Sequence, residues 1–263
     1  MNTRGGGAWN PGQYLRFGGH RLRPALELFQ RVEHDAAGLA VDMGCGTGDI
    51  ARAMAARWPE AEVRGHDLSE AMLEAAEAVD PDARVVWSRA DLRDWRPDRP
   101  VDVLYANAVY QWADDHETLF PRLLGTLAPG GVFAAQMPMS WSEPSHRGLR
   151  DVLDEHGFGT TELRTRLARK WVAEAEEYYG LFRPLTSELD IWETRYIQVL
   201  EGEDPVLEWV KGTGLRPVLE ALEGEEKDRF LSIYAARLRE LYPRRESGET
   251  LYPFPRLFIV ARL

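Results

Sequence analysis

Short apolar runs alternate with segments of helical period between residues 39 and 137, and this alternation restricts the possible folds more than any other feature. Between the runs, stretches such as "DIARAMAARW" and "SEAMLEAAEAV" repeat apolar residues at helical spacing. Units of strand, helix and strand pair parallel strands through right-handed crossovers. The sequence therefore predicts an α/β fold with a Rossmann-like, mostly parallel sheet covered by helices on both faces. The predicted strands are 39–43, 61–67, 83–87, 101–107 and 131–137.

Local signals predict where two of the helices begin. Ser69 is a plausible N-cap before "EAMLEAAEA", and Asp114 with Glu117 has the spacing of a capping box ahead of "TLFPRLLGTL". The "PGG" at 129–131 is expected to close that second helix and turn into the next strand.

The pattern changes after residue 137. Helices are predicted within 147–182, a strand at 187–200, further helices over 204–242, and a last strand at the end of the chain. We divide the chain into an N-terminal lid segment and helix (1–36), a cofactor-binding α/β core (37–137), a largely helical substrate cap with a returning strand (138–253), and a final sheet strand (254–263).

Composition excludes several classes of function. A formal net charge of −11 argues against a protein that binds the phosphate backbone of nucleic acids. No stretch reaches the roughly 18 apolar residues of a membrane span, so we expect no membrane partner and a cytoplasmic location. The single cysteine, Cys45, rules out an intramolecular disulfide and a Cys-rich zinc site, and no metal is expected. The oligomeric state is left open.

Three alternate glycines follow the first predicted strand, in "VDMGCGTGD". Glycine at Gly44, Gly46 and Gly48 permits positive φ and lets a ligand touch the backbone at the carboxyl end of the strand. The run is not the dinucleotide fingerprint, because Asp49 stands where its third glycine belongs, and it lacks the ending of a phosphate-binding P-loop.

Carboxylates accompany this loop at three successive strand ends. Asp42 precedes the glycines, Asp67 can accept both hydroxyls of a ribose, and Asp91 can accept from the exocyclic amine of a purine. Three carboxylates with no basic residue in the loop favour a ligand that carries positive charge over a pyrophosphate.

The arrangement resembles the class I S-adenosylmethionine-dependent methyltransferases, whose first motif is an acidic residue followed by G-x-G-x-G. The resemblance implies S-adenosyl-L-methionine as cofactor and a sheet of seven strands. It also implies that the glycines pass under the amino-acid part of the cofactor, that Asp67 holds its ribose, and that Leu68 belongs to the cofactor site. By the same resemblance Met72 packs on the adenine, Asp91 and Leu92 border it, and Asn107 faces the methionine moiety.

Five further segments, distributed almost from end to end of the chain, resemble the trans-aconitate 2-methyltransferase family. They are "WNPGQYLRFGGHRLRPALELF", "NAVYQW", "QMPMSWSEPSH", "TGLRP" and "YPFPRLFIVARL". The resemblance implies that a carboxylate of trans-aconitate is esterified, with weaker activity on related tricarboxylates. Separately from the resemblance, we expect "WNPGQYLRF" to fold over the ligands as a lid that excludes water.

The chemistry of this reaction fits the residues. A carboxylate is ionised at neutral pH and needs no general base, so no catalytic residue is expected beyond those that position the reactants. The idle carboxylates of an anionic tricarboxylate do need donors, and bidentate arginine is suited to them. The candidates are Arg216 and Arg256, with Arg21 or Arg23 as weaker ones, hydroxyl donors from Tyr14 and Tyr242, and Trp112 or Trp9 as a wall beside the methyl group.

Three other functions stay open at this point. The first is a methyltransferase for another small carboxylic acid, which would have the same glycine motif. The second is an NAD-linked oxidoreductase, which Asp49 disfavours, and the third is a cofactor-binding module without turnover.

Overall fold

The computed structural model describes residues 22–263, which form two compact units. The first unit contains residues 22–137 together with Glu174–Trp192 and Leu257–Leu263. The second contains Pro138–Ala173 and Glu193–Arg256. Helix α8 (Ala175–Phe182) therefore clusters with the sheet, whereas the sequence placed it within the cap segment 138–253. The proposed lid "WNPGQYLRF" lies outside the described residues.

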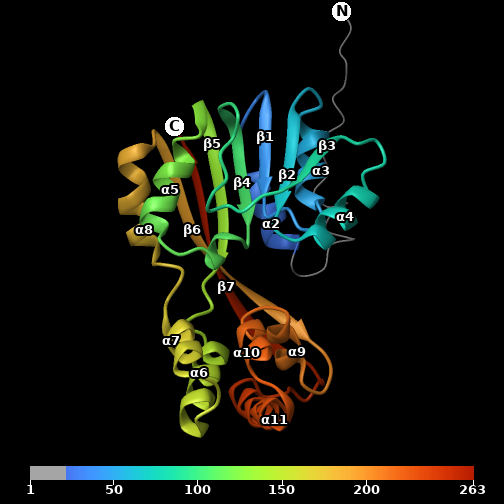
Figure 1. Cartoon of the computed structure of the whole chain (residues 1–263), viewed down its shortest axis with the longest axis vertical. Helices are drawn as coiled ribbons and strands as arrows, with labels where there is room; N and C mark the ends of the chain where they lie inside the picture. Colours follow the sequence, from blue (N-terminus) through green and yellow to red (C-terminus); the bar gives the residue numbers. More distant parts are fainter. Residues whose placement is uncertain (1–21) are drawn as a thin grey trace, which may run out of the picture. The chain divides into compact units, whose positions relative to one another are not determined.

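The first unit is built on a sheet of seven strands in the order β3-β2-β1-β4-β5-β7-β6 (Figure 1). The pairs β1–β2, β2–β3, β1–β4 and β4–β5 are parallel, which confirms the predicted α/β class. Chain order reverses between β1 and its neighbour β4, and ligands of open α/β sheets bind beyond the carboxyl ends of strands at such a point. The strands are β1 (Leu39–Met43), β2 (Glu62–Asp67), β3 (Val85–Arg89), β4 (Val101–Asn107), β5 (Leu127–Pro138), β6 (Glu188–Leu200) and β7 (Thr250–Arg262).

Strand β5 begins earlier than the sequence predicted. The prediction that "PGG" at 129–131 forms a turn is wrong, because these residues lie inside the strand. The register between β4 and β5 shifts between Val101 and Val103, and this irregularity accommodates Gly130 at a φ of +76°. A Cβ atom on Gly131 would come within 2.8 Å of the Ala128 carbonyl oxygen, so glycine is required by close backbone approach. Strand β7 likewise begins at Thr250, before the predicted 254–263.

Seven helical segments of the first unit are described, and one of them begins differently from the prediction. The N-cap of α5 is Asp115, in the left-handed region at a φ of +58°, so the capping box predicted from Asp114 and Glu117 is wrong. Ser69 does occupy the N-cap of α4, but its backbone N–H donates to Asp67 and its side chain makes no cap bond within the described residues. The segments are α2 (Leu22–Gln30), α3 (Asp49–Arg57), α4 (Glu70–Ala78), η1 (Tyr110–Trp112), α5 (His116–Leu124), α8 and η2 (Arg183–Leu185).

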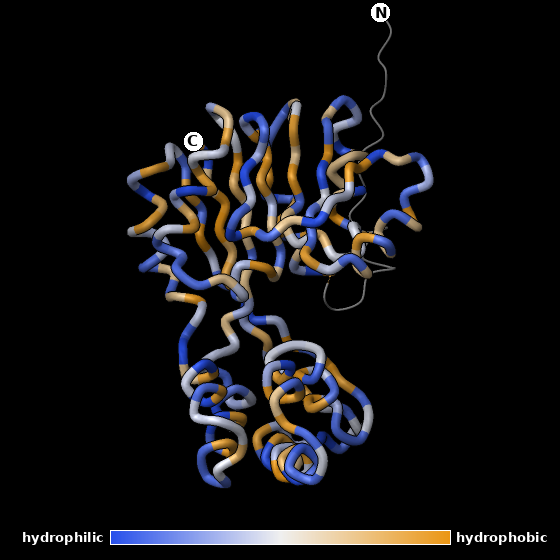
Figure 2. The backbone as a smooth tube through the Cα atoms, in the orientation of Figure 1, coloured by the Kyte–Doolittle hydropathy of each residue, from blue (hydrophilic) through white to orange (hydrophobic). Residues whose placement is uncertain are grey.

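Aromatic side chains fill both faces of the sheet. Register pairs Phe133 of β5 with Leu104, so Phe133 points to the face opposite to that of Tyr105. Tyr105 packs edge-on against Phe29 of α2, while Phe133 contacts Phe182 of α8. Figure 2 shows hydrophobic stretches along the central strands.

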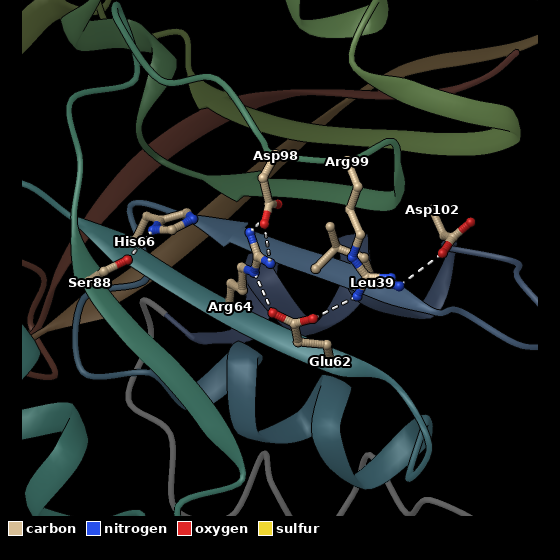
Figure 3. A network of polar contacts seen from close by, with 8 residues as sticks. All are labelled: Leu39, Glu62, Arg64, His66, Ser88, Asp98, Arg99 and Asp102. Carbon is tan, nitrogen blue, oxygen red and sulfur yellow. Dashed lines mark hydrogen bonds and ion pairs between the residues drawn. The ribbon is translucent and has the colours of Figure 1, made fainter.

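A polar network ties the amino-terminal ends of the strands together (Figure 3). Arg64 of β2 donates to Glu62 at 2.6 Å and to Asp98, in the connection before β4, at 2.7 Å. Asp102 accepts the backbone N–H of Leu39 at 2.8 Å. These contacts lie at the end of β1 away from the glycines, so the network supports the sheet from the end opposite to the predicted site.

The second unit is mostly helical. Its helices are α6 (Pro144–His156), α7 (Thr161–Ala168), α9 (Pro205–Lys211), α10 (Arg216–Ala221) and α11 (Gly224–Leu241). The break between α10 and α11 comes at Glu223, in extended conformation, followed by Gly224 at a φ of +53°. Buried side chains of α6 and α11, among them Val152 and Phe230, form one apolar core.

Candidate functional site

The glycine loop joins β1 to α3 and is held against the end of β2. The backbone N–H groups of Gly44 and Cys45 both donate to the carbonyl of His66, at 2.6 and 2.9 Å. The three glycines have φ values of +69°, +53° and +78°. Non-glycine residues rarely adopt this region, so the loop needs the glycines for its conformation alone.

The three glycines differ in what lies beside them. A Cβ atom on Gly44 would come within 2.1 Å of a methyl carbon of Val109, and one on Gly48 within 2.3 Å of the Trp87 ring. Within residues 22–263, a Cβ atom on Gly46 would meet no atom within 4 Å. Side chains of the protein therefore occupy the space at Gly44 and Gly48, and Gly46 is the position that leaves backbone open to a ligand. Sequence reasoning did not identify Val109 or Trp87.

Asp67, the last residue of β2, connects the loop to the start of α4. One carboxylate oxygen accepts the N–H of Gly46 and the other accepts the N–H of Ser69, both at 2.9 Å. Each oxygen keeps a further lone pair, so the carboxylate can still accept the two hydroxyls of a ribose. Leu68 and Met72, the apolar residues predicted beside it, are 53% and 45% exposed, as expected of side chains that a ligand would cover.

Asp42 lies under the loop and is only 3% exposed. Burial raises its pKa to about 7, and the negative charges of Asp67 and Asp49 act in the same direction. A backbone hydrogen bond from Ala51 opposes the shift. Asp42 is therefore a buried carboxyl that is only partly ionised near neutral pH, whereas the sequence analysis counted it as a full negative charge beside the loop.

Cys45 is chemically quiet in this environment. Burial raises the pKa of the thiol, and the neighbouring carboxylates of Asp42 and Asp67 raise it further. The thiolate, which is the reactive form, is therefore disfavoured.

Asp91 and Leu92 lie in the turn that follows β3. Both Asp91 oxygens accept from the guanidinium of Arg93, with Nε at 2.9 and 3.1 Å, and Oδ1 also accepts the Arg93 backbone N–H at 3.0 Å. This hydrogen bonding by Arg93 lowers the pKa of Asp91. A ligand amine that donates to Asp91 must therefore compete with Arg93.

Asn107, the last residue of β4, carries a buried acceptor. Among the described residues its Oδ1 has no hydrogen-bond partner. The next residue, Ala108, has a φ of +57° and donates its N–H to Gln136 at 2.9 Å. Because a buried carbonyl oxygen without a partner is costly, Oδ1 fits the ammonium group of an amino-acid ligand.

The predicted acceptor residues of the second unit have contrasting surroundings. Arg216 begins α10 and is exposed, with Glu220 at 3.8 Å, whereas Arg256 is 5% exposed with its guanidinium over the Phe254 ring. Tyr242 is buried, and its hydroxyl accepts the N–H of Ser145 at 2.9 Å.

The remaining candidates are described only in part. Trp112 ends η1 in the first unit and is 56% exposed. Arg23 pairs with Glu27 at 2.7 Å on the surface of α2. Tyr14, Arg21 and Trp9 lie outside the described residues.

Sequence reasoning also missed a buried hydroxyl cluster in the second unit, centred on Ser145. Its carbonyl accepts from Tyr234 at 3.0 Å, and its Oγ lies 3.2 Å from the hydroxyl of Tyr252. Burial lowers the pKa of the adjacent His146 to about 4, so this side chain is neutral at pH 7. Three tyrosines at distant positions converge on one serine, and no local spacing in the sequence signals this.

Residues 22–263 contain no cluster of three or more His, Cys, Asp or Glu side chains placed to hold a metal ion. None of the helices in that range is long and apolar enough to cross a membrane. The candidate chemistry is therefore that of the glycine loop and its carboxylates.

Comparison with known proteins decides the family. Residues 40–131 match the model of a methyltransferase domain. The chain is 46% identical over 261 residues to a trans-aconitate 2-methyltransferase of Pseudomonas aeruginosa, covering 97% of this chain and 94% of the relative. A protein of the same name from Azoarcus is 45% identical, with 96% and 98% covered. The chain belongs to the trans-aconitate 2-methyltransferase family.

Solved structures support the fold of this family member. The YcgJ protein of Bacillus subtilis superposes with a TM-score of 0.59 at 14% identity, covering 92% of this chain and 98% of that one. A phosphoethanolamine N-methyltransferase of Haemonchus contortus gives 0.54 at 18% identity, covering 91% and 52%. At these identities the likeness concerns the fold alone.

S-adenosylmethionine is the cofactor of this methyltransferase family, and the residues present fit it. The open backbone at Gly46, the acceptor pair of Asp67 and the buried Oδ1 of Asn107 offer places for a ligand with hydroxyl and ammonium groups. Met72 and Leu68 offer apolar surface for a purine.

Proposed function

We propose that the protein transfers the methyl group of S-adenosylmethionine to a carboxylate of trans-aconitate, with weaker activity on related tricarboxylates. The observation that carries the proposal is the identity of 46% along nearly the whole chain to a relative of that name. The match covers the second unit as well as the methyltransferase domain, so it includes segments that the shared fold does not explain.

The residues of the first unit are assigned to the cofactor. Gly46, flanked by Gly44 and Gly48, offers its backbone to the amino-acid part, and Asp67 accepts from the ribose. Asn107 accepts from the ammonium group. The adenine packs on Met72 and Leu68, and its exocyclic amine donates to Asp91, beside Leu92. Asp42 supports the loop from below and, in its ionised form, adds negative potential near the sulfonium.

The reaction depends on aligning the acceptor carboxylate with the methyl group more than on proton transfer. The sulfonium supplies an activated methyl group, and a carboxylate acceptor is already ionised at neutral pH. Holding the two reactants in line supplies most of the gain in rate. His66, the histidine beside the loop, is bonded through Nδ1 to Ser88 at 2.8 Å, and burial lowers its pKa. It therefore has a structural partner and is given no role as a base.

The acceptor is assigned to cations and hydroxyls. Arg256 and Arg216 bind the idle carboxylates, Tyr242 and Tyr14 add hydroxyl donors, and Trp112 covers the methyl group. The burial of Arg256 supports its assignment, because a charged hydrogen bond is stronger where water is excluded. Arg216 keeps its assignment through its place in the "TGLRP" segment, since its exposure alone does not favour binding.

The function is tested with methyl-labelled S-adenosylmethionine and a panel of trans-aconitate, cis-aconitate, citrate, isocitrate and simple monocarboxylates. We expect label in an extractable ester, with the highest kcat/KM for trans-aconitate. Preference for a different small acid would establish the runner-up function, a methyltransferase for that acid. Binding of the cofactor without ester from any acid would leave only a cofactor-binding module.

The acceptor residues are tested with Arg256→Met and Arg216→Ala. Each is expected to raise the KM for trans-aconitate at least tenfold while the Kd for S-adenosylhomocysteine stays within twofold. If Arg256→Met does not fold, Arg256→Lys replaces it in the test, because lysine keeps the buried positive charge. Arg239, which pairs with Asp204 on the surface, supplies the control variant Arg239→Met. Unchanged kinetics in a folded variant would remove that arginine from the acceptor site.

We also propose that the protein acts in the cytoplasm on small anionic molecules, without nucleic acid or membrane partners. The net charge of −11 supports this for nucleic acid. With one cysteine, the chain has no intramolecular disulfide that would require an oxidising compartment. Cell fractionation tests the location.

A further inference from the structure

Arg122 on α5 is a partly buried cation whose donors end on backbone carbonyls. Its Nη1 donates to the carbonyl of Trp95 at 2.9 Å, and its Nη2 donates to those of Leu92 and Arg93 at 2.8 and 3.1 Å. No ion pair within 4.0 Å is found for it among the described residues, and Asp94 is the carboxylate whose charge acts on it. Burial lowers the pKa of Arg122. The hydrogen bonds of this guanidinium therefore go to carbonyl oxygens, while the charge of Asp94 acts on it without a direct contact, which is an unusual use of an arginine.

The three carbonyls belong to one short turn, residues 91–95. Within the turn, the N–H groups of Asp94 and Trp95 both donate to the carbonyl of Asp91, at 3.1 and 2.8 Å. The turn is neither helix nor strand, so no ladder of backbone bonds satisfies its outward carbonyls. Arg122 donates to them from a different element, sharing the Trp95 carbonyl with Arg96, and it thereby sets how the turn lies against α5.

This turn presents Asp91 and Leu92, the residues assigned to the adenine. The carbonyl oxygen of Leu92 accepts a hydrogen bond from the Arg122 guanidinium. The position of Leu92 therefore depends directly on that of the guanidinium. Asp91 sits one residue earlier and anchors the N–H groups of the same turn. A shift of the turn would move the Asp91 carboxylate relative to Asp67, which is fixed separately by the glycine loop.

We propose that Arg122 is a positioning residue for adenine recognition: through three carbonyls it holds Asp91 and Leu92 where the base of the cofactor is read. The inference rests on the assignment of Asp91 to the exocyclic amine made under the proposed function. A planar guanidinium spans three carbonyls at fixed angles, which a flexible ammonium does not reproduce. Arg122 is not among the residues assigned to the cofactor or the acceptor, so its proposed role is exerted through the turn alone.

The test compares the Kd of S-adenosylhomocysteine with that of S-inosylhomocysteine, in which a carbonyl replaces the exocyclic amine. Isothermal titration of the wild-type protein should show at least tenfold preference for the adenosyl ligand. In Arg122→Met the Kd for S-adenosylhomocysteine should rise at least tenfold, and the preference should fall to that of Asp91→Asn. The Kd and the ligand preference of Arg122→Lys should lie between those of the wild type and Arg122→Met. If Arg122→Met does not fold, Arg122→Lys is compared with the wild type instead.

A matched control comes from the same connection between β3 and β4. Arg99 donates to Glu62 of β2 at 2.6 Å (Figure 3), and it makes none of the hydrogen bonds given for residues 91–95. Arg99→Met should keep both affinities within twofold of the wild type. A purely structural role for Arg122 would weaken both ligands equally and leave the preference unchanged, which would overturn the inference. A wild-type protein that binds S-adenosylhomocysteine without preference would instead refute the role of Asp91, and the inference with it, while the cofactor assignment stands.

Discussion

Replacing Asp42 by Asn should make the cofactor-free protein more stable at alkaline pH than the wild type. Asp42 lies in β1, where its register partners are Gly65 of β2 and Tyr105 of β4, and it is 3% exposed. Burial, and to a lesser degree Asp67 and Asp49, raise its pKa from its ordinary 3.8 to about 7. Asn keeps the shape of the side chain but carries no charge that must be buried.

The sign of the effect follows from proton linkage. Below about pH 4 the carboxyl is protonated in both states, so its contribution to stability is fully present. Between about pH 4 and pH 7 the unfolded chain releases the proton while the folded chain keeps it, so the free energy of unfolding falls as pH rises. At about 1.4 kcal/mol per pH unit, the loss reaches at most about 4 kcal/mol above pH 7.

Differential scanning calorimetry of the cofactor-free wild type and Asp42→Asn between pH 4.5 and pH 8 measures this loss. The difference in unfolding temperature between the two should grow over this pH range by up to about 6 °C, given an unfolding entropy of roughly 2 cal/mol/K per residue. Taking the difference cancels every other titrating group that the two proteins share.

Asp98 provides a control of opposite sign. A hydrogen bond from Arg64 lowers the pKa of Asp98, so this carboxylate contributes stability above its unfolded pKa and loses it as pH falls (Figure 3). The stability of Asp98→Asn relative to wild type should therefore fall as pH rises from acid. A difference between wild type and Asp42→Asn that is flat or shrinks from pH 4.5 to pH 8 would refute the reasoning.

Two further predictions concern the cofactor loop and its neighbour. Both Gly44→Ala and Gly46→Ala place alanine at positive φ, at a cost of about 1–2 kcal/mol each. Only Gly44→Ala also clashes with Val109, so it should lower the unfolding temperature more, whereas Gly46→Ala should mainly raise the Kd for S-adenosylhomocysteine; the reverse order would contradict the placement of the ligand. Arg93→Leu should free Asp91 from its intramolecular partner and strengthen S-adenosylhomocysteine binding by up to about fivefold in a titration, since exposed ion pairs are weak. Weaker binding would mean that Arg93 itself contacts the cofactor.

The local sequence pattern was sufficient to predict the bounds of an element where its own residues determine its conformation. Strands β1 and β4 occupy the predicted 39–43 and 101–107, because a buried parallel strand is a continuous apolar run bounded by turn residues. The prediction of how α5 begins was wrong, because local spacing alone did not determine the N-cap residue. Asp114 and Glu117 have the spacing of a capping box, but the chain enters the helix through Asp115 in the left-handed region.

The candidate site divides in the same way. The sequence by itself determined the alternating glycines, the acidic strand ends and the family, since the order of residues along strands and turns carries all three. Only the tertiary structure decided that Gly46 is open while Val109 and Trp87 fill the space at Gly44 and Gly48, and that Arg122 holds the turn of Asp91. These contacts join residues from separate strands and helices, and the packing that brings them together follows from the whole sheet rather than from any local spacing.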